Sequence, residues 1–556
     1  MNSLIHIKYR HAKKVVFTFF LLLFLVGFFT YQDYGMSIDE EFQRSSGFFW
    51  LNYVLSFTSL NDLNYIVSEK FSSISGFTLL SPENISFYGV IFDLPLALIE
   101  TIFKIDDSQN YFFLRHYTNF FIFFISSIFF YFILKNRFKY FSVSFIGTLF
   151  YILSPRIYGA SFYNNKDILF LSLVTITLYF CHKALTKINY KNIIIFSLFC
   201  AFCTSTRIVG IIFPFSFLLI YFLSLINNKK KIKQLNIIVV FLFSYLIFLF
   251  IHWPYLWSAP LENFANILNS YDKYLIEIKV LFNGNYENSK FLPYSYIPLW
   301  LLITTPVVHI LFFLYGFQYK IRRTFKRFLS IKEKSITPDF WRGSNEKNDF
   351  YMLFVFLSIL LYLISLKVTL YNSWRHIFFL NIFVVYFSTL GFYCLFNHLN
   401  TVKKKFSLIL FVLLFFIMII YKMISYHPYQ NIYFNSLVPN NFKNKFEIDY
   451  MGISGLKFLK KIINLVNKKD QINIGVASFL PLERSLALVD KESREKINFV
   501  GQNYESADFI YTNNISEVDK NLNKKYDIPT SFVKIDEFIV DGAKVYEVYK
   551  NNLRFK

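Results

Sequence analysis

The stretch VVFTFFLLLFLVGFFTY, residues 15–31, contains no charged side chain. An apolar run of about 20 residues is long enough to cross a lipid bilayer as an α-helix. Basic residues precede the run at Lys8, Arg10, Lys13 and Lys14. No small-residue cleavage site follows it, so we expect a retained membrane anchor with a cytoplasmic N-terminus and no removed signal peptide.

The composition of the whole chain agrees with a membrane protein. Of 556 residues, 55% are hydrophobic and 22% aromatic, whereas 17% are charged, and the mean hydropathy is +0.39. The 74 Phe and 40 Tyr residues exceed what a soluble core can use. These values exclude an ordinary cytosolic enzyme, a disordered protein and a secreted disulfide scaffold. The four cysteines lie inside apolar runs, and packing is their expected role, so no metal or redox site is predicted from them.

Further apolar runs of near-spanning length follow along the chain. They lie near residues 114–134, 139–155, 168–186, 191–205, 208–226, 235–252, 297–317, 350–367, 376–396 and 406–424. The fold class predicted is therefore a polytopic α-helical membrane protein with about eleven spanning helices. The apolar piece 87–103 contains Asp93, Pro95 and Glu100, and we interpret it as a helix lying along the outer surface.

The net charge of +22 arises largely from lysines and arginines between the apolar runs. Dense basic groups occur in alternate loops, at residues 135–139, 183–191, 229–233, 320–347 and 403–405. Such groups mark cytoplasmic loops, so nucleic acid is not expected as a partner. The remaining loops are then external, including the long loops 32–113 and 253–296. This pattern predicts a multi-pass membrane protein with a cytoplasmic N-terminus; the inner membrane of a bacterium is what the resemblance described below implies.

Residues after 424 have a different character. Short β-rich runs occur at 472–477, 509–512 and 544–549, beside a helical pattern at 455–466. We therefore expect two domains: a transmembrane domain over 1–424 and a soluble periplasmic α/β domain over 425–556.

Two acidic residues, Asp39 and Glu40, stand just beyond the first apolar run within MSIDEE, residues 36–41. Adjacent carboxylates at a membrane surface could act as a general base or hold a divalent cation. The alternative is a helix N-cap, because Ser37 followed by acids suits the first turn of a helix.

Other charged residues begin or end later apolar runs on the same predicted face. Lys166 and Asp167 precede one run, Arg207 separates two, and Arg375 and His376 open another. A guanidinium group suits bidentate phosphate binding. Each residue alone also fits a purely structural role, such as a snorkelling lysine or an interfacial Trp/Arg belt. Their convergence from separate helices predicts a site that binds an anionic headgroup and performs acid–base chemistry.

Several stretches resemble the GT-C superfamily of lipid-sugar-dependent glycosyltransferases, which includes protein O-mannosyltransferases and the aminoarabinose transferase of lipid A. Within that superfamily, the stretches are more similar to a bacterial membrane glycosyltransferase group related to family 39. The stretches are SPRIYGASFYNNKDI (154–168), TRIVG (206–210), HWPYLW (252–257), LYNSWRHIFFL (370–380), HPYQNIYFNSLV (427–438) and EIDYMGIS (447–454). One departure is Asn165, where the family pattern has proline before the lysine.

The resemblance implies an inverting transfer of a sugar from a polyprenyl-phosphate carrier to a lipid, glycan or protein acceptor on the periplasmic side. It implies Asp39 as the base, Glu40 beside it and Asp167 as a second acid, with Lys166, Arg207, Arg375 and His376 at the lipid phosphate. No nucleotide is needed, and the resemblance leaves open whether a divalent cation is a cofactor. The alternatives are a transporter or flippase of a lipid-linked or anionic solute, and a structural protein whose external domain binds a partner.

Overall fold

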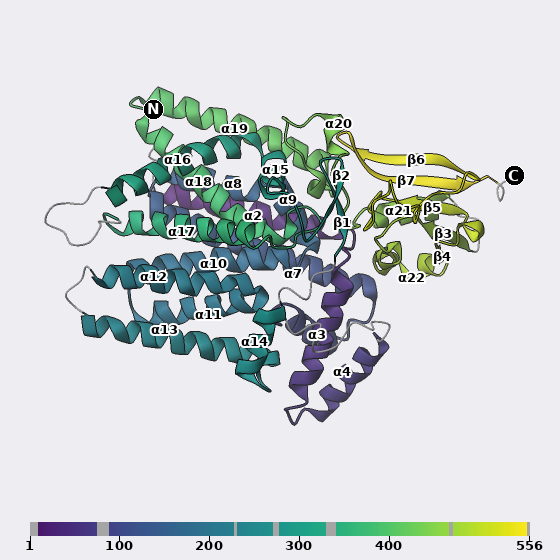
Figure 1. Ribbon diagram of the computed structural model, residues 1–556, viewed down its shortest axis with the longest axis horizontal. Helices are drawn as coiled ribbons and strands as arrows, with labels where there is room; N and C mark the ends of the chain where they lie inside the picture. The colour runs from purple at the N-terminus through teal and green to yellow at the C-terminus, as the bar shows by residue number, and fades with distance from the viewer. Residues whose placement is uncertain are drawn as a thin grey trace.

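The computed structural model describes residues 9–74, 88–226, 231–270, 277–329, 341–465 and 471–552. Long helices form a bundle along the longest axis of the molecule, and a smaller β-containing domain lies at one end (Figure 1). The predicted fold class, a polytopic helical membrane protein with a C-terminal α/β domain, is confirmed.

All eleven apolar runs predicted from the sequence are helical. The helices that contain them are α2 (Tyr9–Thr30), α7 (Ser108–Phe138), α8 (Phe141–Ile152), α10 (Asp167–Thr186), α11 (Tyr190–Thr206), α12 (Ile212–Ile226), α13 (Lys231–His252), α15 (Tyr296–Thr304), α16 (Val307–Leu329), α17 (Ser344–Ser365), α18 (Asn381–His398) and α19 (Val402–Ser425). The 3₁₀ segments η2 (Ile208–Ile211) and η4 (Arg375–Leu380) lead into α12 and α18.

The lengths of these helices bear on the number of crossings. Within the described part of the chain, eight helices are long and apolar enough to span a membrane, while α8 and α11 are apolar but shorter. The run 297–317 is not one helix: α15 ends at Thr304, Thr305 is extended, and α16 starts after Pro306. Proline disfavours a helical conformation in the residue before it and lacks an N–H for the helix. The count of eleven spans therefore remains a prediction.

Small residues allow a close helix contact in the bundle. Helices α16 and α18 pack against each other along most of their length, and Gly316 faces Gly391 where they cross. A Cβ atom on Gly316 would overlap the backbone carbonyl of Phe387. Backbone-to-backbone contact of this kind is typical of membrane helices, whose association depends on close packing.

The segments predicted to be external gather at the end of the bundle that carries the C-terminal domain (Figure 1). They form α3 (Glu40–Leu55), α4 (Asn61–Ser73), α6 (Asp93–Ile102), η3 (Pro254–Leu256), α14 (Pro260–Ser270) and the hairpin β1 (Lys279–Phe282) with β2 (Asn285–Asn288). The piece 87–103 is helical only from Asp93, packs against α3, and buries Glu100; residue 87 lies outside the described residues. Its place at the membrane surface remains a prediction.

The C-terminal domain contains a five-stranded mixed sheet. Its strand order is β4-β3-β5-β7-β6; β3 is parallel to β4 and β5, whereas β7 is antiparallel to β5 and β6. The strands are β3 (Ile472–Val476), β4 (Ile497–Gly501), β5 (Phe509–Thr512), β6 (Phe532–Val540) and β7 (Ala543–Asn551), accompanied by α21 (Gly455–Leu465) and α22 (Lys491–Arg494). The three predicted strands and the predicted helix are present, and β4 and β6 are additional.

The chain between α19 and α21 contacts the helices and also the sheet domain, where Lys443 pairs with Asp541 at 2.7 Å. The Tyr34 hydroxyl donates to the Gln430 side chain at 3.0 Å, and Asn435 donates to the carbonyl of Thr305 at 2.9 Å. Its short elements are η5 (Gln430–Ile432) and α20 (Asn440–Lys443). The segment thus joins the two parts of the molecule at the end where the predicted site residues lie.

Candidate active site

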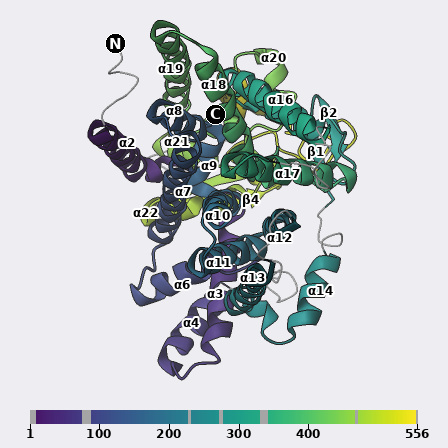
Figure 2. The same cartoon turned by 90° about the vertical axis from the view of Figure 1, so that its left-hand side faces the viewer.

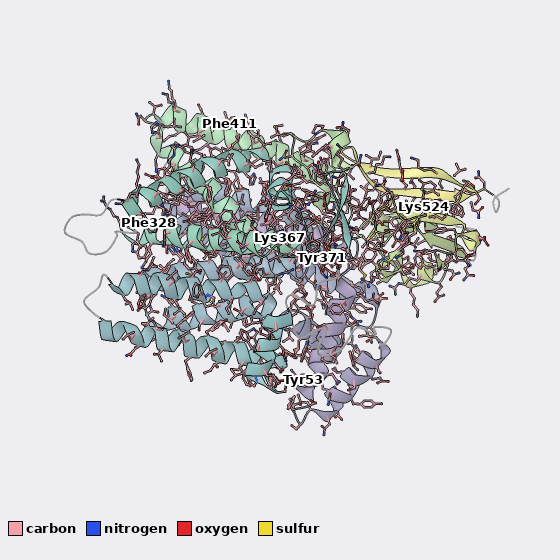
Figure 3. The ribbon with its side chains drawn as sticks, in the orientation of Figure 1. Tyr53, Phe328, Lys367, Tyr371, Phe411 and Lys524 are labelled. Carbon is pink, nitrogen blue, oxygen red and sulfur yellow. The ribbon has the colours of Figure 1, made fainter. Side chains whose placement is uncertain are left out.

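The ends of separate helices position the predicted site residues. Asp39 immediately precedes α3, Asp167 is the first residue of α10, Arg207 follows α11, and Arg375 begins η4. Tyr371, four residues before Arg375, lies at the end of the bundle that faces the C-terminal domain (Figure 3). Segments far apart in the sequence therefore meet at one face.

Asp167 connects the two arginines in a continuous ion-pair network. Arg375 pairs through Nη1 with Oδ2 of Asp39, and the same nitrogen lies 3.7 Å from Oδ2 of Asp167. The other oxygen of Asp167 pairs with Nη2 of Arg207. The side chains of Arg375 and Asp167 are 6% and 1% exposed, so the network is largely withdrawn from solvent. Pairs in such surroundings are screened less than surface pairs.

Asn164 fixes the orientation of Asp167. Its side-chain amide donates to Oδ2 of Asp167 at 2.9 Å, and its side-chain oxygen accepts the backbone N–H of Asp167 at 3.0 Å. Asp167 is therefore held from three sides. This arrangement suits a residue that positions its neighbours more than one that must approach a substrate.

Lys166 adds a third cation to the network. Its ammonium group lies over the ring of Tyr88. Burial, together with the nearby charge of Arg207, lowers the pKa of Lys166 well below its ordinary value, although Asp39 and Asp167 oppose the shift. A bound anion would restore the charged form. Lys166, Arg207 and Arg375 face the two carboxylates of Asp39 and Asp167, so the protonated cluster has one net positive charge.

Asp39 retains access to solvent within this network, because its side chain is 33% exposed. Burial raises the pKa of Asp39, but Arg375 outweighs that effect and holds the pKa below its ordinary value. Asp39 is thus ionised at neutral pH. It occupies the N-cap position of α3 but makes no side-chain capping hydrogen bond, so the capping alternative does not describe this residue.

Glu40 lies apart from the network. Its carboxylate accepts the backbone N–H of Ser37 at 2.7 Å and contacts Nε2 of His116 at 2.9 Å, and the residue is 1% exposed. The contact with Ser37 resembles the reach-back contact of a capping box, although the N-cap of α3 is Asp39. Glu40 thus stabilises the turn before α3, and the two adjacent acids have different surroundings.

His376 lies beside the cluster and against an aromatic ring. Its imidazole makes an edge-to-face contact with Tyr371, with ring centroids 4.5 Å apart. The imidazole also interacts electrostatically with the charged groups of the cluster, namely Arg375, Arg207, Asp39 and Lys166. The structure thus brings together Asp39, Lys166, Asp167, Arg207, Arg375 and His376, whereas Glu40 is the predicted residue outside the group.

Sequence reasoning missed the residues that hold the turn before Arg375. Asn372 and Ser373 have φ angles of 56° and 65°, a conformation that costs a residue other than glycine about 1–3 kcal/mol. The Tyr296 hydroxyl donates to the carbonyl of Ser373 at 3.0 Å, and Arg156 donates to the Ser373 hydroxyl at 3.3 Å. These contacts hold the turn in this conformation and so fix the position of the Arg375 backbone.

Glu447, which follows α19 in the chain, also contacts this turn. Burial raises the pKa of Glu447 to about 8, although hydrogen bonds from the backbone N–H groups of Ser373 and Asn372 oppose the shift. Both Glu447 and Arg156 stand inside stretches that resemble known transferases, EIDYMGIS and SPRIYG. That likeness was the available signal, but no spacing in the sequence relates either residue to Ser373.

The C-terminal domain also holds the segment that carries Asp39. The backbone N–H of Ile38 donates to the carbonyl of Met451 at 3.0 Å. Arg484 donates to the carbonyl of Ile38 and lies 3.3 Å from the carboxylate of Glu41. The residue before Asp39 is therefore bonded through both of its backbone groups to residues beyond α19.

The carboxylates of the site are not arranged to bind a metal ion. Across the described ranges, no group of three or more His, Cys, Asp or Glu side chains is placed to bind one. The carboxylates of Asp39 and Asp167 face guanidinium groups. The residues present thus suit an anion better than a divalent cation.

Comparisons with known proteins give one family match. Residues 96–257 match the family of dolichyl-phosphate-mannose-protein mannosyltransferases, which confirms the resemblance to GT-C glycosyltransferases over that segment. Among solved structures, ArnT from Cupriavidus metallidurans bound to undecaprenyl phosphate is 10% identical, with a TM-score of 0.45, covering 96% of this chain and 97% of that chain. Apo ArnT from the same organism is 9% identical, with a TM-score of 0.47, covering 97% and 98%. No curated protein matches the chain.

Proposed function

We propose that this protein is an inverting glycosyltransferase that moves a sugar from a polyprenyl-phosphate-linked donor to an acceptor on the periplasmic side of a bacterial inner membrane. The observation that carries the proposal is the network Asp39–Arg375–Asp167–Arg207. It places one partly exposed, ionised carboxylate beside cations suited to a phosphate. The match of residues 96–257 to a family of lipid-phosphate-dependent mannosyltransferases supports this chemistry.

In this mechanism, Arg375, Arg207 and Lys166 bind the donor phosphate. A guanidinium group offers two parallel N–H donors to phosphate oxygens. As the acceptor oxygen bonds to the anomeric carbon, the bond from that carbon to the phosphate oxygen breaks and the phosphate gains one negative charge. Preorganised cations stabilise that charge without having to reorient.

Asp39 takes the proton of the acceptor hydroxyl. While it is paired with Arg375, its low pKa makes it a weak base. When Arg375 turns toward the donor phosphate, the effect of burial remains and that of the guanidinium weakens, so the pKa of Asp39 rises. Donor binding thereby strengthens the base. The charge is also balanced, since Asp39 loses a negative charge on protonation as the leaving phosphate gains one.

Asp167 and Glu40 act in this scheme as positioning residues. Asp167 holds both arginines, and Asn164 in turn holds Asp167. Glu40 ties the start of α3 to His116 and so fixes the direction of Asp39. Neither carboxylate needs to contact the acceptor.

A transporter or flippase of a lipid-linked solute is the second candidate. Such proteins place their charged residues near mid-bilayer on broken helices. The cations here lie at helix ends, at the end of the bundle that carries the C-terminal domain, an arrangement suited to transfer at the surface. A cleft there would expose the sugar to an acceptor without moving the lipid across.

The test is to incubate the purified chain with a panel of polyprenyl-phosphate sugars carrying a labelled sugar and with lipid, glycan and protein acceptors. Release of polyprenyl phosphate with labelled acceptor is expected, and it should be lost in Asp39→Asn. Labelled lipid that crosses proteoliposome membranes without cleavage would favour the transporter. If no sugar is released with any donor, the transferase proposal fails.

A further inference from the structure

A second charged feature lies at the opposite end of the bundle from Asp39. A cavity of about 630 Å³ opens where α7 and α10 end and where α11 and α17 begin. Figure 2 looks onto this end of the bundle, where α10 lies between α7, α11 and α17. Phe328, near the end of α16, marks the same end in Figure 3, far from Tyr371.

The lining of this cavity is positively charged. It includes Lys139, Lys183, Lys187 and Lys191, and none of its lining residues is acidic. Within the described part of the chain, none of these four lysines forms an ion pair. Two buried acids near the cavity are neutralised separately: Asp349 by Arg137 at 2.6 Å and 2.7 Å, and Glu346 by Arg323 and Arg327. The cavity therefore keeps its positive potential.

Neutral donors supplement the lysines. The first turns of α11 and α17 contribute Asn192 and Ser344–Asn345 to the wall. These helices have 17 and 22 residues, and the first backbone N–H groups of a helix favour a negative charge. They add to the attraction that the lysine side chains provide.

The position of the cavity relates it to the membrane surface. Helix α10 runs for 20 residues from Asp167, in the candidate active site, to Thr186, in the cavity wall. At 1.5 Å per residue it spans about 30 Å, the thickness of the hydrocarbon core. The cavity therefore lies at the level of the other leaflet's headgroups.

Apolar side chains border the lysines. Ile188, in the loop after Lys187, and Tyr190, the first residue of α11, expose 45% and 51% of their surface. Exposed apolar groups next to a cationic cavity suit a ligand with a charged head and hydrocarbon chains. A free anion would gain nothing from them.

We propose that this cavity binds the headgroup of an anionic phospholipid in the leaflet opposite the candidate active site. The lysines contact the phosphate, and Ile188 and Tyr190 pack against the proximal acyl chains. A basic pocket between membrane helices is a recognised headgroup site. The positive-inside rule accounts for the sign of these loops, but it does not require their lysines to converge on one cavity without acids.

The experiment compares two variants with the same loss of charge. The cavity variant is Lys183→Gln with Lys187→Gln and Lys191→Gln. The control variant is Lys403→Gln with Lys404→Gln and Lys405→Gln, at the start of α19, in a basic group predicted on the same membrane side. Each full-length protein is purified in neutral detergent, checked for monodispersity, and titrated with phosphatidylglycerol or phosphatidylcholine by native mass spectrometry.

Binding of phosphatidylglycerol should weaken on the order of 100-fold in the cavity variant and change little in the control variant. Phosphatidylcholine should bind weakly to all three proteins, and millimolar inorganic phosphate should not displace phosphatidylglycerol. Equal losses in both variants, or displacement by inorganic phosphate, would overturn the proposal. If the triple variant is not monodisperse, Lys187→Gln and Lys404→Gln form the same comparison, with a several-fold loss expected only in the first. None of these measurements depends on sugar transfer.

Discussion

Arg375 offers the sharpest test of the proposed site, because Lys preserves its charge but not its geometry. In the structure, Nη1 of Arg375 pairs with Asp39 and lies 3.7 Å from Asp167, and the side chain is 6% exposed. A lysine ammonium is a single point charge on a shorter reach. Arg375→Lys is therefore expected to keep one of these contacts at most while the donor phosphate is bound.

The size of the effect follows from the contact that is lost. A hydrogen bond to a charged group contributes about 1.5–3 kcal/mol, and each 1.4 kcal/mol is a factor of ten. Arg375→Lys should thus lower kcat/KM for the donor about 10- to 150-fold. Arg375→Ala should lower it further, since the carboxylates of Asp39 and Asp167 then lose a cation. It should also raise the pKa of Asp39, so the loss of activity on acidification should begin at higher pH.

The assay measures kcat, donor KM and polyprenyl-phosphate affinity from pH 5 to 9 at matched expression. Arg137→Lys is the matched control, because Arg137 also pairs with a buried acid, Asp349, but at the other end of the bundle. It should leave donor KM unchanged even if less protein folds. Wild-type turnover and donor affinity in Arg375→Lys would refute the assignment and leave Lys166 and Arg207 as the phosphate ligands.

Three further predictions concern the base, the buried acid and the sidedness of the chain. Asp39→Asn should lower the rate about 10²–10⁴-fold, as expected for a general base, whereas Glu41→Gln, whose side chain is 43% exposed, should have a small effect; equal mild losses would contradict the assignment of Asp39. Glu447 has a pKa of about 8 against an ordinary value of 4.5, so the folded protein holds a proton that the unfolded chain has lost, and stability should fall as pH rises from about 4.5 to 8. The thermal midpoint of Glu447→Gln should fall less over that range, and identical slopes would contradict the shift. In a background without the four native cysteines, Gln502→Cys should react with an impermeant thiol reagent in intact spheroplasts, and protection there would reverse the predicted topology.

The helices could be predicted from sequence because their cause is local. Apolar length alone specifies a membrane helix, and all eleven runs are helical. The division of 297–317 was missed because Thr305-Pro306 was treated as part of a run, although proline and the residue before it both disfavour helix. Strands β4 and β6 were missed for another reason: polar residues interrupt them, Asn498 in β4 and Lys534, Asp536 and Glu537 in β6, so neither forms a continuous apolar run.

The site was predictable in outline but not in its contacts. Charged residues at the mouths of membrane helices are costly without a partner or a task, and this directed attention to Asp39, Asp167 and Arg375. The pairing of Asp39 with Arg375 joins residues 336 positions apart, and no periodicity encodes such a pair. The different surroundings of Glu40 were equally hidden, because its partner His116 belongs to the long helix α7 and carried no signal of its own.

The C-terminal domain is separate in sequence character but not in its contacts with the site. Ile38, the residue before the proposed base, bonds through its N–H to Met451 and through its carbonyl to Arg484. Glu447 meets the turn that leads to Arg375. Residues from beyond α19 therefore support both partners of the Asp39–Arg375 pair. A movement of this domain relative to the bundle would change the distance between the base and the phosphate-binding cation, the two groups whose separation decides whether Asp39 is a weak or a strong base.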